Sequence, residues 1–75
     1  MNTENELYYR ATQIPVVEAL DSQNPELIEK CLAETEEILR EAKEKHILLN
    51  YRRTLQINIR LLRANLDGNM QLKIF

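Results

Sequence analysis

The pentapeptide HILLN, residues 46–50, separates two apolar stripes that point to opposite sides of the chain. The first stripe, before it, consists of Ile28, Cys31, Leu32, Thr35, Ile38, Leu39 and Ala42. The second stripe consists of Leu48, Tyr51, Leu55, Ile59, Leu62 and Leu66. At about 100° per residue each stripe occupies one helical face, and the two faces lie roughly 180° apart. One straight helix cannot bury both, so the sequence predicts two antiparallel helices, about 25–46 and 50–66.

Composition also favours an all-α fold. The 75 residues are 44% hydrophobic and contain one glycine and two prolines. A chain rich in Leu, Ile, Glu, Arg and Lys is typical of a helical, coiled-coil-like protein. Its length allows a single domain, residues 1–75, and a domain of this size buries only about 60% of its unfolded surface. We therefore expect marginal stability without a partner.

Turn signals divide the domain into an N-terminal helix or arm, residues 1–23, and a hairpin, residues 24–67. Pro15 lacks a backbone N–H, so a short helix over residues 4–13 should stop before it. The apolar residues that follow favour one further helical turn. The pair Asn24-Pro25 can cap and open the first long helix.

The remaining residues, 68–75, are expected to form a flexible tail. Gly68 suits the left-handed position that commonly ends a helix. After it, Met70, Leu72 and Ile74 alternate with polar residues, which favours an extended segment. At the start of the second helix, Asn50 is a candidate cap.

Charge changes sign at the same boundary. Residues 26–46 hold seven acids and four bases, a balance of −3, whereas residues 47–75 hold five bases and one acid, a balance of +4. An antiparallel pair of helices would therefore set an acidic flank beside a basic one. Clustered arginines also suggest nucleic acid, but no aromatic residues interleave with them, and a solvated or paired face is the better interpretation.

No residue pattern indicates catalysis, a cofactor or a metal ion. The single cysteine, Cys31, and the single histidine, His46, would lie about 22 Å apart on one helix, too far for a nucleophile and its base. Cys31 is expected in the core and His46 near a helix end. The first twenty residues lack the features of a signal peptide, and no apolar run approaches bilayer length. We therefore expect a non-enzymatic cytoplasmic protein that does not insert into membranes.

The second helix carries a further apolar face, which is the best indication of a partner. Ile57, Leu61 and Ala64, here called the outer stripe, lie nearly opposite the second stripe. Either the N-terminal segment folds back to cover them, or another chain does. The candidate partner-binding residues are Val16, Val17, Leu20, Tyr51, Ile57 and Leu61.

The hexapeptide YRRTLQ, residues 51–56, resembles the tyrosine-led start of the second helix in the small YscE/PscE-type co-chaperones of the type III secretion needle. The resemblance covers roughly residues 25–66 and includes the acidic first helix. It implies a helical hairpin that pairs with a tetratricopeptide-like chaperone, the two together keeping the needle subunit soluble in the bacterial cytoplasm. The alternative is a self-associating regulator, a homodimeric four-helix bundle. A nucleic-acid-binding hairpin is the more distant option.

Overall fold

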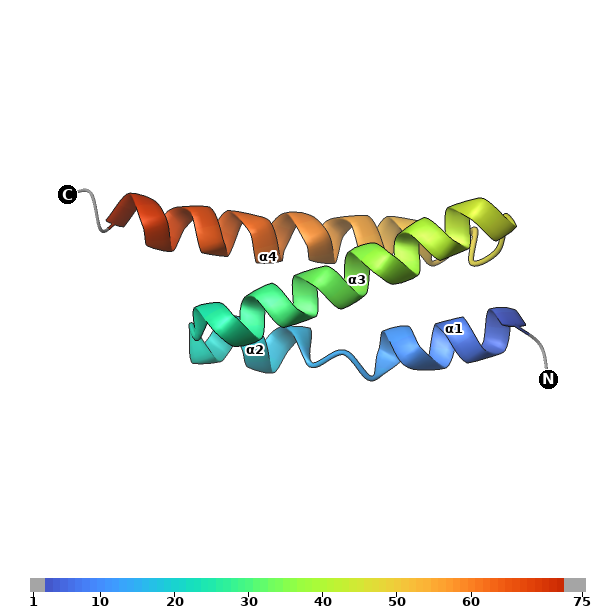
Figure 1. The fold of residues 1–75 in the computed structure, drawn as a ribbon, viewed down its shortest axis with the longest axis horizontal. Helices are drawn as coiled ribbons and strands as arrows, with labels where there is room; N and C mark the ends of the chain where they lie inside the picture. Colours follow the sequence, from blue (N-terminus) through green and yellow to red (C-terminus); the bar gives the residue numbers. More distant parts are fainter. Residues whose placement is uncertain (1–2, 73–75) are drawn as a thin grey trace.

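The described part of the chain forms four helices joined by short turns. The computed structural model describes the backbone of residues 3–72 and the side chains of residues 3–68. Its helices are α1 (Thr3–Thr12), α2 (Val16–Ser22), α3 (Pro25–Lys45) and α4 (Arg52–Leu72). Figure 1 shows α3 and α4 joined at one end as a hairpin, with α1 and α2 in line along the other side of α3. The predicted all-α hairpin is confirmed.

Local signals explain the break between α1 and α2 and the start of α3. Pro15 separates α1 from α2, and the helical turn expected after it is α2. Before α3, the Asn24 side chain accepts a hydrogen bond from the Glu26 N–H at 3.0 Å, and Pro25 occupies the first turn. The cap satisfies an amide that has no partner within the helix. The start of α3 is therefore fixed locally, as predicted.

The hairpin turn uses two left-handed residues, neither of them glycine. His46 has φ 55° and Leu48 has φ 57°. The Ile47 N–H donates to the Ala42 carbonyl at 3.0 Å and the His46 N–H to the Lys43 carbonyl at 3.3 Å, the two bonds of a Schellman motif. Left-handed backbone costs a non-glycine residue free energy, so packing must compensate for it. The buried side chain of Leu48 supplies such packing.

One core, formed by all four helices, contains both predicted stripes. From α3 it takes Ile28, Cys31, Ile38, Leu39 and Ala42, and from the hairpin turn and α4 it takes Leu48, Leu55 and Leu62. The hydroxyl of Thr35, also buried, donates to the Cys31 carbonyl at 2.7 Å. Leu7, Ala11, Ile14 and Ala19 of the N-terminal segment complete the core. The N-terminal segment therefore packs on the hairpin as part of its core.

The end of α4 corrects the sequence prediction. The second helix was expected to end near residue 66 with Gly68 in a left-handed cap, but α4 continues to Leu72 and Gly68 has no positive φ. An extended segment from Met70 is therefore wrong for residues 70–72, and residues 73–75 lie outside the described residues. A glycine within a helix costs only about 1 kcal/mol relative to alanine. An established helix gains one hydrogen bond for each residue it adds, which outweighs a short alternating pattern.

Candidate interaction surface

The outer stripe remains exposed in the folded chain. Ile57 is 47% exposed and Leu61 is 51% exposed, and Ala64 beside them is also exposed. The spacing i, i+4, i+7 places the three on one face of α4, opposite the buried Leu55 and Leu62. The N-terminal segment does not cover this stripe, because α1 and α2 pack on the other side of the hairpin (Figure 1). The N-terminal segment does fold back onto the hairpin, but the expectation that it covers the outer stripe is wrong.

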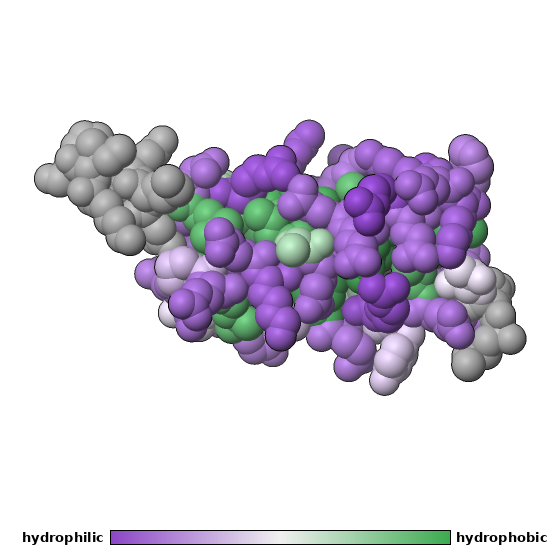
Figure 2. Space-filling view, viewed as in Figure 1, coloured by the Kyte–Doolittle hydropathy of each residue, from purple (hydrophilic) through white to green (hydrophobic). Residues whose placement is uncertain are grey.

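Hydrophobic side chains elsewhere on the surface are scattered. Figure 2 shows one side of the molecule, on which separated hydrophobic areas lie among hydrophilic side chains, one of them next to the described end of α4. Among the described residues outside α4, the exposed large hydrophobic side chains are those of Tyr8, Tyr9, Val17 and Leu49. Isolated apolar residues are ordinary on a protein surface, whereas residues aligned along one helix face form a surface on which another helix can pack.

The four arginines that suggested nucleic acid have different roles. Arg63 pairs with Glu36 of α3 at 2.7 Å, which is the expected contact between basic and acidic flanks. Arg52 turns back to the end of α3, where its guanidinium donates to the Ala42 carbonyl at 2.9 Å and the Ile47 carbonyl at 3.2 Å. Arg53 and Arg60 are exposed, and no ion pair found among the described side chains includes them. Two arginines thus contact α3 or the hairpin turn, and two lie exposed beside the outer stripe.

The six candidate partner-binding residues do not form one site. Ile57 and Leu61 lie together on α4. Val16 and Leu20 are partly buried against the core, whereas Val17 between them is 68% exposed on α2. Tyr51 is partly buried, its ring edge-on to that of Tyr8 with 5.0 Å between centroids. Only the α4 pair and Val17 therefore present large apolar surface outward.

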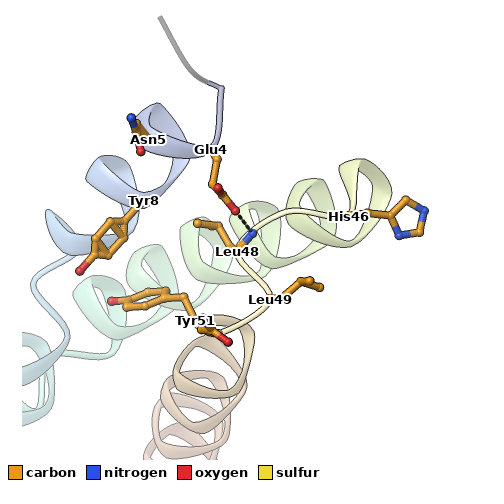
Figure 3. Close-up of a pocket in the computed structure, with 8 residues that line it drawn as sticks. Glu4, Asn5, Tyr8, His46, Leu48, Leu49 and Tyr51 are labelled. Atoms are coloured by element: carbon orange, nitrogen blue, oxygen red, sulfur yellow. Dashed lines mark hydrogen bonds between the residues drawn. The ribbon is translucent and has the colours of Figure 1, made fainter.

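A hollow at the hairpin turn was not predicted from the sequence. It has a volume of about 410 Å³ and lies between α1 and the turn. Figure 3 shows the rings of Tyr8 and Tyr51 close together and the His46 ring pointing away. Glu4 of α1 accepts a hydrogen bond from the Leu48 N–H at 2.7 Å. The adjacent Tyr8 and Tyr9 diverge by about 100° on a helix, and Tyr8 lines the hollow whereas Tyr9 does not.

Glu4→Ala is expected to lower the free energy of unfolding by about 1–2 kcal/mol, because it leaves the partly buried Leu48 N–H without its carboxylate acceptor. Chemical denaturation monitored by circular dichroism measures this change. Amide hydrogen exchange at Leu48 should accelerate in the same variant. Glu4→Gln keeps an acceptor oxygen and should lose less. Unchanged exchange at Leu48 in Glu4→Ala would contradict the contact.

Among the described residues, two titratable groups have shifted pKa values, Cys31 through burial and Glu41 through ion pairing. Burial, followed by the nearby charge of Glu34, raises the pKa of the Cys31 thiol, which lies 3.8 Å from the Pro15 carbonyl. The hydrogen bond from Lys45 lowers the pKa of Glu41, which also lies 3.6 Å from Arg10. A buried thiol with a raised pKa is a poor nucleophile. Within residues 3–68, no three His, Cys, Asp or Glu side chains are grouped so as to hold a metal ion.

The fold and this surface define a class, an all-α helical hairpin with an N-terminal helical segment and an exposed apolar face on its second long helix. No helix in the described part of the chain has the length and apolar character needed to cross a bilayer. Comparisons with protein-family models, curated proteins and solved structures gave no significant match. The functional argument therefore depends on the surface itself.

Proposed function

We propose that this chain is a non-enzymatic protein-interaction module, an accessory chaperone of the YscE/PscE type. In this role it would bind a tetratricopeptide-like chaperone and help to keep a type III secretion needle subunit soluble in the bacterial cytoplasm. The observation that supports an interaction role is the outer stripe, with Ile57 and Leu61 about half exposed on a helix whose other face is already packed. The resemblance of residues 25–66 to those co-chaperones supports the particular partner.

The outer stripe suits recognition of a helix or a helical groove. A helix that packs on one neighbour needs only one apolar face, and α4 has two. Fully burying a Leu or Ile side chain is worth about 1.5–3 kcal/mol, so covering two that are half exposed gains a useful part of a binding free energy. The outer stripe therefore offers a partner an apolar surface, and binding there leaves the core of the domain undisturbed.

The double variant Ile57→Glu, Leu61→Glu tests the proposal. The chain is co-expressed with the tetratricopeptide-like chaperone and needle subunit of the cell that encodes it, and co-purification is measured. We expect the variant to reduce recovery of the complex at least tenfold, because two carboxylates would have to be buried without partners. Helix content should be unchanged, because both residues lie outside the core.

A matched control adds the same charge elsewhere. Gln13→Glu, Ala33→Glu changes two exposed positions outside α4 and should leave recovery unchanged. Loss of helix content in the double variant would show that Ile57 and Leu61 stabilise the monomer, and unchanged recovery would show that the partner binds elsewhere. Either result contradicts the proposal.

Self-association through the same face is the alternative function. Two hairpins joined by their α4 helices would form a four-helix bundle. Sedimentation of the purified chain over a range of concentrations separates the two proposals. A monomer at high concentration contradicts self-association, and a stable dimer abolished by Ile57→Glu, Leu61→Glu supports it.

A further inference from the structure

We propose that the outer face of α4 binds an acidic amphipathic helix of another protein, which lies along Ile57 and Leu61 with its carboxylates beside Arg53 and Arg60. The inference rests on the proposed function, since it names the chemistry of the partner for the same face. The proposed binding depends on the charge of Arg53 and Arg60 as well as on the apolar surface of Ile57 and Leu61. The two can therefore be tested separately.

The charge along one edge of the outer stripe is predominantly positive. Arg53 and Arg60 are seven residues apart, two helical turns, so both lie on the same edge. Asp67 follows at the next such position, so the edge reads basic, basic and acidic toward the end of α4. The opposite edge carries Asn58 and Asn65, which are uncharged. A partner helix would gain most from two carboxylates opposite the arginines and none opposite Asp67.

The inner face of α4 already binds a helix of this kind. α3 presents the apolar first stripe toward α4 and holds seven acids against four bases over its length. Its Glu36 pairs with Arg63 at 2.7 Å across the helix interface. The outer face has the same plan, an apolar stripe with arginines on its edge, but no helix of the described chain occupies it. A partner helix similar in character to α3 would match that plan.

A second copy of this chain fits the outer face less well. The apolar stripe of α3 is buried within its own hairpin, so a copy would offer only the polar side of α3. An antiparallel pairing of two α4 helices about the outer stripe would set each Arg53 opposite Asp67 of the other copy, but it would also set the two Arg60 side chains against each other. An acidic partner helix places a carboxylate opposite both arginines and avoids that repulsion. The acidic N-terminal helices expose Tyr9 and Val17, but on separate helices of ten and seven residues. The complementary partner is therefore a helix of another protein.

Two amphipathic peptides of equal length test this inference. They share one leucine stripe and differ at two flanking positions, which carry Glu in one peptide and Lys in the other, with Gln placed opposite Asp67. Fluorescence anisotropy measures their binding to the full chain at low salt. We expect the Glu peptide to bind about tenfold more tightly, and the difference to shrink as salt screens exposed charges. The variant Arg53→Glu, Arg60→Glu should reverse the preference.

Charge-matched and apolar controls make the outcomes distinct. Arg40→Glu, Lys43→Glu makes the same net change on the exposed side of α3 and should keep the preference for the Glu peptide. Equal binding of the two peptides overturns the charge inference while leaving the interaction face intact. Binding that survives Ile57→Glu, Leu61→Glu overturns both the inference and the proposed face. Absence of binding by either peptide, or a dimer that occupies the face, overturns the inference, and the co-expression experiment then decides the proposed function separately.

Discussion

Leu62→Ala is expected to lower the free energy of unfolding by about 2–5 kcal/mol, the usual cost of deleting a buried leucine side chain and leaving a cavity. Leu62 lies near the middle of α4 and is 0% exposed. A chain of this length has a total stability of about 4–11 kcal/mol, at 0.05–0.15 kcal/mol per residue. One truncation should therefore remove a large fraction of the stability, and the variant should unfold at a much lower urea concentration.

The neighbouring residue provides the control. Leu61→Ala makes the same chemical change one position earlier, but Leu61 is 51% exposed on the outer stripe. It should cost less than about 1 kcal/mol, because solvent already reaches the side chain and no cavity forms. Urea unfolding followed by far-ultraviolet circular dichroism compares the two variants. Equal losses would contradict the assignment of Leu61 to the surface and Leu62 to the core.

The contrast between Leu61 and Leu62 was available in the sequence, because helical phase alone separates them. The first and second stripes, read at about 100° per residue, predicted both the hairpin and most of its core. Asn24-Pro25 similarly predicted the start of α3 from local chemistry. These predictions were correct because each depends on residues within a few helical turns of one another.

The features that sequence reasoning missed depend on distant contacts or on small energy differences. Glu4 meets the Leu48 amide 44 positions later, and no local pattern encodes that contact. The turn at His46 and Leu48 lacks glycine, so its left-handed backbone left no signal in composition. At Gly68 the helix penalty is small enough for α4 to continue. In each case tertiary packing or helix propagation outweighs the local preference.

The arginines of the candidate surface show the same limit of prediction from sequence. Arg52 and Arg53 are adjacent and chemically identical, and helical phase separates them only by about 100° around α4. In the structure Arg52 donates to two carbonyls near the end of α3, whereas Arg53 is exposed beside the outer stripe. Placing a side chain by phase identifies its face but not its hydrogen-bond partners. Comparing variants of Arg52 and Arg53 can therefore measure what the hydrogen bonds of Arg52 contribute to stability.

Arg52→Ala is expected to lower the free energy of unfolding by about 1.5–3 kcal/mol. Its guanidinium spans from the Ala42 carbonyl, at 2.9 Å, to the Ile47 carbonyl, at 3.2 Å, on either side of the left-handed His46. The carbonyls at a helix C-terminus carry partial negative charge, so a cation there is stabilising. Hydrogen bonds to a charged group are worth about 1.5–3 kcal/mol, and partial exposure keeps the total near that of one such bond. Loss of this contact should weaken the hairpin turn.

Two substitutions distinguish the geometry of Arg52 from its charge. Arg53→Ala removes the same charge from an exposed position and should change the free energy of unfolding by less than about 0.5 kcal/mol. Arg52→Lys keeps the charge but replaces a planar, multi-donor fork with a single ammonium, so it should recover only part of the loss. Urea unfolding of the three variants gives the comparison. If Arg52→Lys were fully stable, charge alone would account for the effect, and the two-carbonyl contact would contribute nothing that a point charge cannot.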